Sequence, residues 1–120
     1  MKEHLKDLFS EAVQMKEKGE LESSKQILFD LAQRDPESPA ILAVLGDVCW
    51  DMRLLDEAVT AFQRAIELRP RVEGLSLALF HCLWELGRRE EALEETKRFM
   101  SISDSEDYRE IVREINEKYQ

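Results

Sequence analysis

The sequence has no long apolar run, only two cysteines, and little glycine or proline. Its uncharged, mainly apolar runs, such as the one between Ser38 and Gly46, are far short of the roughly 18 residues that a membrane span needs. The segment from Met1 to Glu20 is charged throughout and lacks the apolar core of a secretory signal. Cys49 and Cys82 show no CxxC spacing, so we expect reduced, buried thiols in a cytoplasmic protein. A disulfide is the alternative, and it would need a secretory route that the sequence does not indicate.

Basic charge is also scarce. The net charge of −9 opposes binding to phosphate backbones and to anionic membrane surfaces. The sequence contains no nucleophile elbow, glycine-rich phosphate loop or metal-spaced cluster. These absences predict a protein that is not an enzyme and that binds no cofactor, metal, nucleic acid or membrane. Apolar residues make up 43% of the 120 residues and charged residues 36%, which suits one domain over residues 1–120.

What the sequence does contain is an internal repeat. Pro36 and Pro70 are separated by the same number of residues as Trp50 and Trp84. Three further series of residues follow the same step: Ser24, Ala58 and Ala92; Leu28, Phe62 and Thr96; Leu31, Ala65 and Phe99. So many matches in one register indicate repeated units.

Apolar residues at helical spacing predict two helices in each unit. The outer units have expected helices at about 3–18, 21–34, 73–86 and 89–101. In the middle unit, Ser38 is expected to cap a helix that begins at Pro39, and Arg69–Pro70 ends the second helix. Gly19 and Gly87 share one position after a first helix, where a left-handed cap favours glycine.

A seventh helix is predicted at about 105–119, with a capping box of Ser103 and Glu106. One apolar stripe runs along it from Tyr108 to Tyr119. If this stripe packs on Phe99 and Leu93, the chain is expected to be a capped monomer, because a repeat stack leaves its last apolar face bare. If the helix projects instead, the stripe becomes a dimer interface or a ligand for a neighbouring copy.

The pattern resembles the tetratricopeptide repeat family. Residues 54–70 carry its Ala–Phe–Ala–Pro signature at Ala58, Phe62, Ala65 and Pro70, and Leu45–Gly46 matches its Leu–Gly pair. The resemblance implies an all-α, right-handed α-solenoid of three helix–turn–helix repeats, at about 5–38, 39–72 and 73–106, with a seventh capping helix. It also implies that Ala58 faces Gly46 at a close helix–helix approach. The third unit departs from the pattern, because Phe80 stands where Gly46 does, and Asp104 replaces the expected proline.

In this family the first helix of each pair lines a concave groove, so the resemblance also implies a binding site. By register, the predicted groove residues are Phe9, Val13, Ala43, Asp47, Trp50, Asp51, Leu77, His81, Trp84 and Glu85. They describe an apolar floor with an acidic rim. The alternative for Trp50 and Trp84 is that both are core residues between neighbouring units.

The resemblance therefore implies a non-catalytic interaction module, an adaptor or chaperone-like protein, that binds a peptide or helical segment of another protein. The ligand is expected to have apolar anchors and basic flanks. The carboxylate clamp of some family members is absent, because its positions carry Phe9, Val13, Val44, Gly74 and Ala78. The alternative function is a structural scaffold that self-associates through its terminal helix or its repeat ends, although a monomer is favoured over a homodimer.

Overall fold

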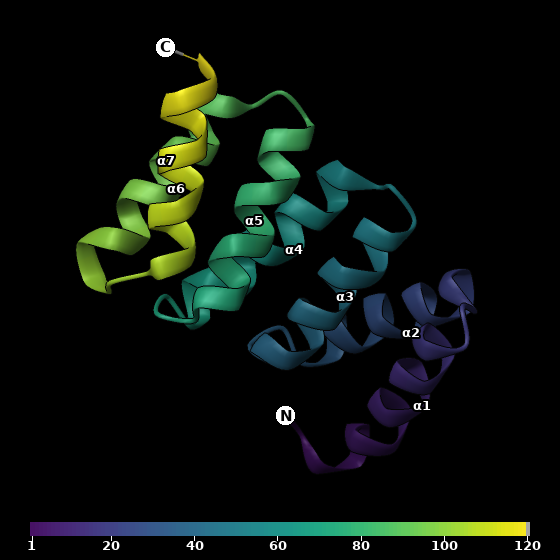
Figure 1. The fold of residues 1–120 in the computed structure, drawn as a ribbon. Helices are drawn as coiled ribbons and strands as arrows, with labels where there is room; N and C mark the ends of the chain where they lie inside the picture. The colour runs from purple at the N-terminus through teal and green to yellow at the C-terminus, as the bar shows by residue number, and fades with distance from the viewer. Residues whose placement is uncertain (120) are drawn as a thin grey trace.

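The computed structural model describes residues 1–119. A short 3-10 turn (Glu3–Leu5) precedes seven helices: α1 (Lys6–Glu17), α2 (Leu21–Arg34), α3 (Pro39–Asp51), α4 (Leu55–Leu68), α5 (Glu73–Glu85), α6 (Arg89–Ile102) and α7 (Glu106–Tyr119). No strand occurs between residues 1 and 119. The helices stack in chain order, with the two ends of the chain at opposite ends of the stack (Figure 1). The predicted all-α solenoid is confirmed, and the molecule is elongated, with extents of 50 × 26 × 19 Å.

The turns within the helix pairs share one backbone conformation. Gly19 and Gly87 have positive φ angles of 80° and 78°, as predicted. Arg53 stands at the same repeat position between α3 and α4, and its φ is also positive, at 62°. At the start of α3, the Ser38 hydroxyl accepts a hydrogen bond from the Ile41 amide at 3.4 Å, which confirms the predicted cap.

Close packing at Gly46 involves the side chain of Phe62. A methyl group at Gly46 would lie 2.7 to 2.9 Å from ring carbons of the buried Phe62. The Phe62 ring therefore occupies the space that the glycine leaves open, and the position of Ala58 opposite Gly46 stays a prediction. In the third unit the register puts Phe80 at the position of Gly46 and Thr96 at the position of Phe62, and both are buried. The large residue is therefore on the second helix in the middle unit (Phe62) and on the first helix in the third unit (Phe80).

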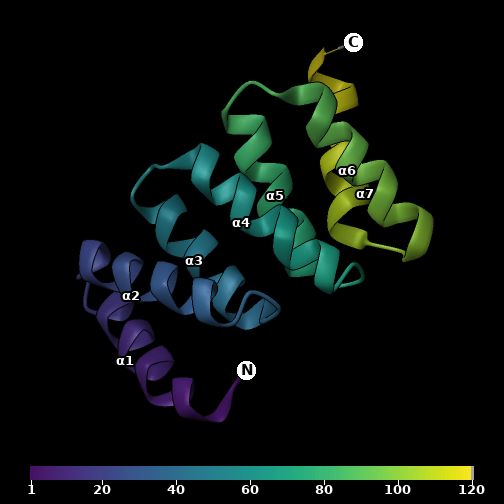
Figure 2. The same ribbon diagram turned by 180° about the vertical axis from the view of Figure 1, so that it is seen from behind.

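Helix α7 closes the stack beside α6, as both views of the ribbon show (Figures 1 and 2). Tyr108 is fully buried, with its ring centroid 5.8 Å from those of Phe80 and Phe99. The expected contact with Phe99 is confirmed, whereas the expected packing on Leu93, which is 42% exposed, stays a prediction. The predicted capping box was wrong, because the Ser105 hydroxyl, not Ser103, accepts from the Tyr108 amide at 3.1 Å.

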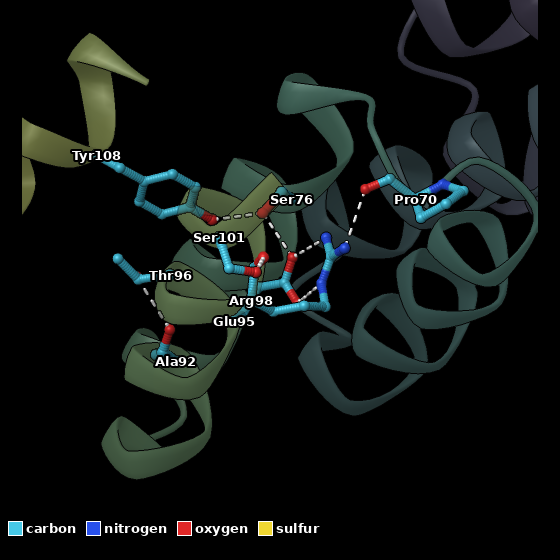
Figure 3. Close-up of polar contacts among 8 residues, drawn as sticks. All are labelled: Pro70, Ser76, Ala92, Glu95, Thr96, Arg98, Ser101 and Tyr108. Atoms are coloured by element: carbon cyan, nitrogen blue, oxygen red, sulfur yellow. Dashed lines mark hydrogen bonds and ion pairs between the residues drawn. The ribbon is translucent and has the colours of Figure 1, made fainter. Parts of the chain in front are cut away.

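A buried polar network fixes α7 to the rest of the chain (Figure 3). The Ser76 hydroxyl donates to the Glu95 carboxylate at 2.5 Å and lies 2.6 Å from the Tyr108 hydroxyl. Arg98 donates to both carboxylate oxygens of Glu95, at 2.8 and 2.6 Å, and to the Pro70 carbonyl at 2.9 Å. The network therefore joins α5, α6, α7 and the loop that follows α4.

Cys49 and Cys82 are free and buried, which confirms the expected buried thiols. Burial raises the pKa of each thiol to about 11, with a further increase from Glu57 near Cys49 and from Glu85 near Cys82. Both thiols are therefore neutral at neutral pH.

Candidate partner-binding surfaces

The predicted groove residues lie on α1, α3 and α5, the first helix of each pair. The apolar members Phe9, Val13, Ala43, Trp50, Leu77 and Trp84 are half-buried, whereas Asp47, Asp51, His81 and Glu85 are exposed. The two tryptophans therefore belong neither to the fully buried core nor to the freely exposed surface.

Aromatic rings form a row across three helices. Trp50 of α3 stacks with His81 of α5 at a centroid distance of 6.4 Å. His81 contacts Phe80 at 5.4 Å, and Phe80 stacks on Trp84 at 5.7 Å. Trp84 then meets Tyr119 of α7 edge-on at 6.1 Å. We call these five residues, Trp50, His81, Phe80, Trp84 and Tyr119, the aromatic row.

The residues at the α7 end of the aromatic row were not predicted from the sequence. Tyr119 and Arg89 were not among the predicted groove residues, yet the Arg89 guanidinium carbon lies 4.8 Å from the Trp84 ring centroid and 5.2 Å from that of Tyr119. A signal was available, because Tyr119 stands one repeat step after Glu85. Continuing the register into α7 places Tyr119 where a further first helix would carry a groove residue.

The acidic residues beside the row are partly neutralised. Asp51 pairs with Lys16 at 3.9 Å, and Glu85 pairs with Arg53 at 2.6 Å. Asp47 has no ion-pair partner within residues 1–119. Although its side chain is exposed, partial desolvation of the carboxylate raises its pKa; Asp51 adds to this increase, and Lys16 opposes it.

The structure does not bring every predicted residue into the row. Phe9 packs against the core from α1, and no aromatic contact joins it to Trp50 in the described part of the chain. Val13, Ala43 and Leu77 are half-buried and make no aromatic or polar side-chain contact within residues 1–119 that would set them apart.

A second surface, on the opposite helices of the pairs, was not anticipated. A cleft of about 510 Å³ lies between α2 and α4, above α3. Its lining includes Phe29, Ala32, Leu42, Leu45, Cys49 and Ala61, with Lys25, Glu57 and Arg64 among its charged residues. The signal in the sequence was Phe29, an apolar residue at the position where the later units have Gln63 and Lys97.

Within residues 1–119, no helix is long and apolar enough to cross a membrane. His, Cys, Asp and Glu residues in this part of the chain form no group of three or more that could hold a metal ion.

Comparison with known proteins identifies the repeat and the fold. The tetratricopeptide repeat family model matches residues 39–72, and no curated protein matches the sequence. The type III secretion chaperone SycD of Yersinia enterocolitica, in complex with a peptide of the translocator YopD, is similar with a TM-score of 0.78 and 17% identity over 98% of this chain and 90% of that one.

A mutant of MamA is similar with a TM-score of 0.76 and 21% identity, covering 87% of this chain and 76% of that one. A further structure, MamA AMB-1, has a TM-score of 0.74 at 22% identity, and the match covers only 59% of its length. At these identities the likeness shows a shared fold.

Proposed function

Since its middle unit is a tetratricopeptide repeat and its helices form a solenoid, we propose that this chain is a non-catalytic adaptor or chaperone-like protein that binds a segment of a partner protein along the aromatic row. The observation that carries this proposal is the row itself, which presents half-buried tryptophans at one repeat position on neighbouring helices. Aromatic side chains of this kind provide much of the affinity at protein interfaces.

The charge near the row supports a partner with apolar anchors and basic flanks. Asp47 and Asp51 lie on α3 beside Trp50, and the whole chain carries a net charge of −9. Such a field attracts basic segments and increases their association rate. SycD, solved with a peptide of YopD, gives a precedent in the same fold for holding a peptide. We further propose that the chain acts as a monomer in the cytoplasm.

The experiment titrates the full chain with a short synthetic peptide that has leucine anchors and lysine flanks, while tryptophan fluorescence is recorded. Trp50 and Trp84 are the only tryptophans, so the emission reports on the row. We expect emission that iodide quenches in the free protein, a saturable shift on peptide binding, and a loss of about tenfold or more in affinity for Trp84→Ala. Phe29→Ala is the matched control, because it removes an aromatic ring outside the row and is expected to leave affinity unchanged.

Two outcomes would contradict the proposal. One is emission from a monomer that iodide cannot quench and that no peptide changes, which would make both tryptophans core residues. The other is a homodimer by light scattering in which the tryptophans are protected, which would favour the scaffold alternative.

A further inference from the structure

The cleft between α2 and α4 has the dimensions of a binding site. Its volume of about 510 Å³ lies within the range of roughly 300 to 1,000 Å³ that is typical of ligand pockets. Leu42, Leu45 and Cys49 from α3 are among its buried lining residues, and Ala32 and Ala61 contribute from the two flanking helices. The Cys49 thiol donates to Glu57 at 3.8 Å and is neutral at neutral pH, so it adds no charge to this apolar surface.

Phe29 makes the cleft unlike the rest of this surface. Its side chain is 57% exposed, the highest value among the large exposed apolar residues of the described chain. The equivalent positions in the next two units carry Gln63 and Lys97, which suit solvent. An exposed aromatic ring beside a buried apolar surface marks a place where a partner can cover both.

Four charged residues line the cleft: Glu22, Lys25, Glu57 and Arg64. Lys25 and Glu57 pair with each other across it at 2.8 Å. Arg64 lines the same cleft and has no hydrogen-bond or ion-pair partner among residues 1–119. Of the two cations in the cleft, Arg64 is therefore the one that is free to bind a carboxylate, and Glu22 on α2 is an acid in the same lining.

In the third unit, the arginine at the position equivalent to Arg64 does have a carboxylate partner. Arg98 stands one repeat step after Arg64 and binds Glu95 of its own helix through two hydrogen bonds of 2.8 and 2.6 Å. At the position of Glu95 the middle unit has Ala61, which opens the cleft and leaves Arg64 without an acid. A bidentate arginine–carboxylate pair is strong and geometrically specific.

We propose that the α2–α4 cleft is a second binding site, which takes a protein segment with a bulky apolar side chain and a nearby carboxylate. The apolar side chain packs on Phe29 and Leu45, and the carboxylate binds Arg64. This ligand chemistry is opposite in charge to that of the aromatic row, so the two surfaces select different segments.

The test selects random peptides displayed on phage against the full chain, with removal of those that also bind the Arg64→Glu variant. We expect selected peptides to share an aspartate or glutamate near a bulky apolar residue, and to bind Arg64→Glu and Phe29→Asp at least tenfold more weakly than the unmodified chain. Replacing the peptide carboxylate with lysine should weaken binding to the unmodified chain and restore it to Arg64→Glu. Arg69→Glu is the matched control, because it makes the same charge change on an exposed residue at the end of α4, and should leave binding unchanged.

Three outcomes would overturn this proposal. The first is that selection yields no peptide that distinguishes Arg64→Glu from the unmodified chain. The second is that the selected peptides depend on Trp84 and not on Arg64, which would place them on the aromatic row. The third is a homodimer of the unmodified chain that Arg64→Glu dissociates, which would make the occupant a second copy. Arg64 and Phe29 lie at the surface, so circular dichroism should show an unchanged fold in these variants.

Discussion

At the scale of single residues, Gly46 is constrained by the Phe62 ring that packs against it. Gly46→Ala would add a methyl group within 2.9 Å of the Phe62 ring, which is itself buried, so the ring or the helix would have to shift. Alanine gains about 1 kcal/mol in helix propensity, but overpacking costs about 1 to 3 kcal/mol, so we expect a net destabilisation of about 1 kcal/mol in urea unfolding. Gly74→Ala in α5 is the control, because nothing lies within 4 Å of the added methyl group, and it should stabilise the protein. Equal effects of the two substitutions would contradict this account.

Arg53 has a backbone conformation that glycine adopts more easily. Its φ of 62° costs an L-residue about 1 kcal/mol or more, whereas its exposed ion pair with Glu85 contributes less than about 1 kcal/mol. We therefore expect Arg53→Gly to raise the free energy of unfolding by about 0.5 kcal/mol. Arg53→Ala removes the same ion pair but keeps the strained φ, so it should not stabilise. A stabilising Arg53→Ala would show that the side chain, and not the backbone, is unfavourable.

Sequence reasoning located these special residues but not all their neighbours. The shared position of Gly19, Arg53 and Gly87 was visible, because a turn position depends on the local chain alone. The contact between Phe62 and Gly46 was not predicted, because the reach of the Phe62 ring depends on its rotamer and on the crossing of α3 and α4. A linear repeat register contains neither quantity.

At the scale of helices, α7 depends on a buried phenol. Burial raises the pKa of Tyr108 to about 12, although its hydrogen bond with Ser76 opposes the increase. The ordinary value is about 10, so the contribution of this group to stability is complete below about pH 10 and is lost as the pH rises towards 12, by up to about 3 kcal/mol. We expect the stability difference between the unmodified chain and Tyr108→Phe to shrink over this range in urea unfolding.

The control for this titration is the difference in phenolate absorbance between the same two proteins, which should follow Tyr108 alone. A constant stability difference from pH 8 to about 12 would show that α7 does not depend on the neutral phenol.

The helix boundaries were predictable, but the attachment of the last helix was only partly so. An apolar stripe and a serine near the start predicted α7, yet the capping serine was displaced by two positions, because several serines stand close together before Glu106. The polar network was not predicted at all. Ser76 stands where Leu8 and Leu42 do, and this change has meaning only together with Glu95 and Tyr108, which are distant in sequence.

At the scale of the whole molecule, a stack of helices held by nearest-neighbour contacts should open from its ends. Tyr108→Ala removes the ring that contacts Phe80 and Phe99, so we expect faster amide hydrogen exchange in α7 and α6, with α1 and α2 unchanged. Hydrogen exchange with mass spectrometry measures this by segment. Tyr119→Ala is the matched control, since that ring is 53% exposed and should affect only the end of α7. A uniform acceleration across the chain would instead indicate a single cooperative unit.

The candidate surfaces differ in how far the sequence could reveal them. Trp50 and Trp84 were identified because one repeat position projects to one face of the stack. The α2–α4 cleft was missed, because it results from two second helices standing apart over α3, and its charged residues look like an ordinary solvated face. Only comparison of the units, with Ala61 where Glu95 stands, separates Arg64 from other surface arginines.

The exchange of large and small residues between Gly46–Phe62 and Phe80–Thr96 bears on how such a chain can evolve. If the units descend from one ancestral copy, a lineage that substituted either position first would have carried two rings in one space or an empty cavity, and both states reduce stability. Divergence between neighbouring units would then have required correlated substitutions. For the same reason, a chimaera that joins α3 to α6 would bring Gly46 against Thr96 and leave a void, although each helix comes from a working repeat.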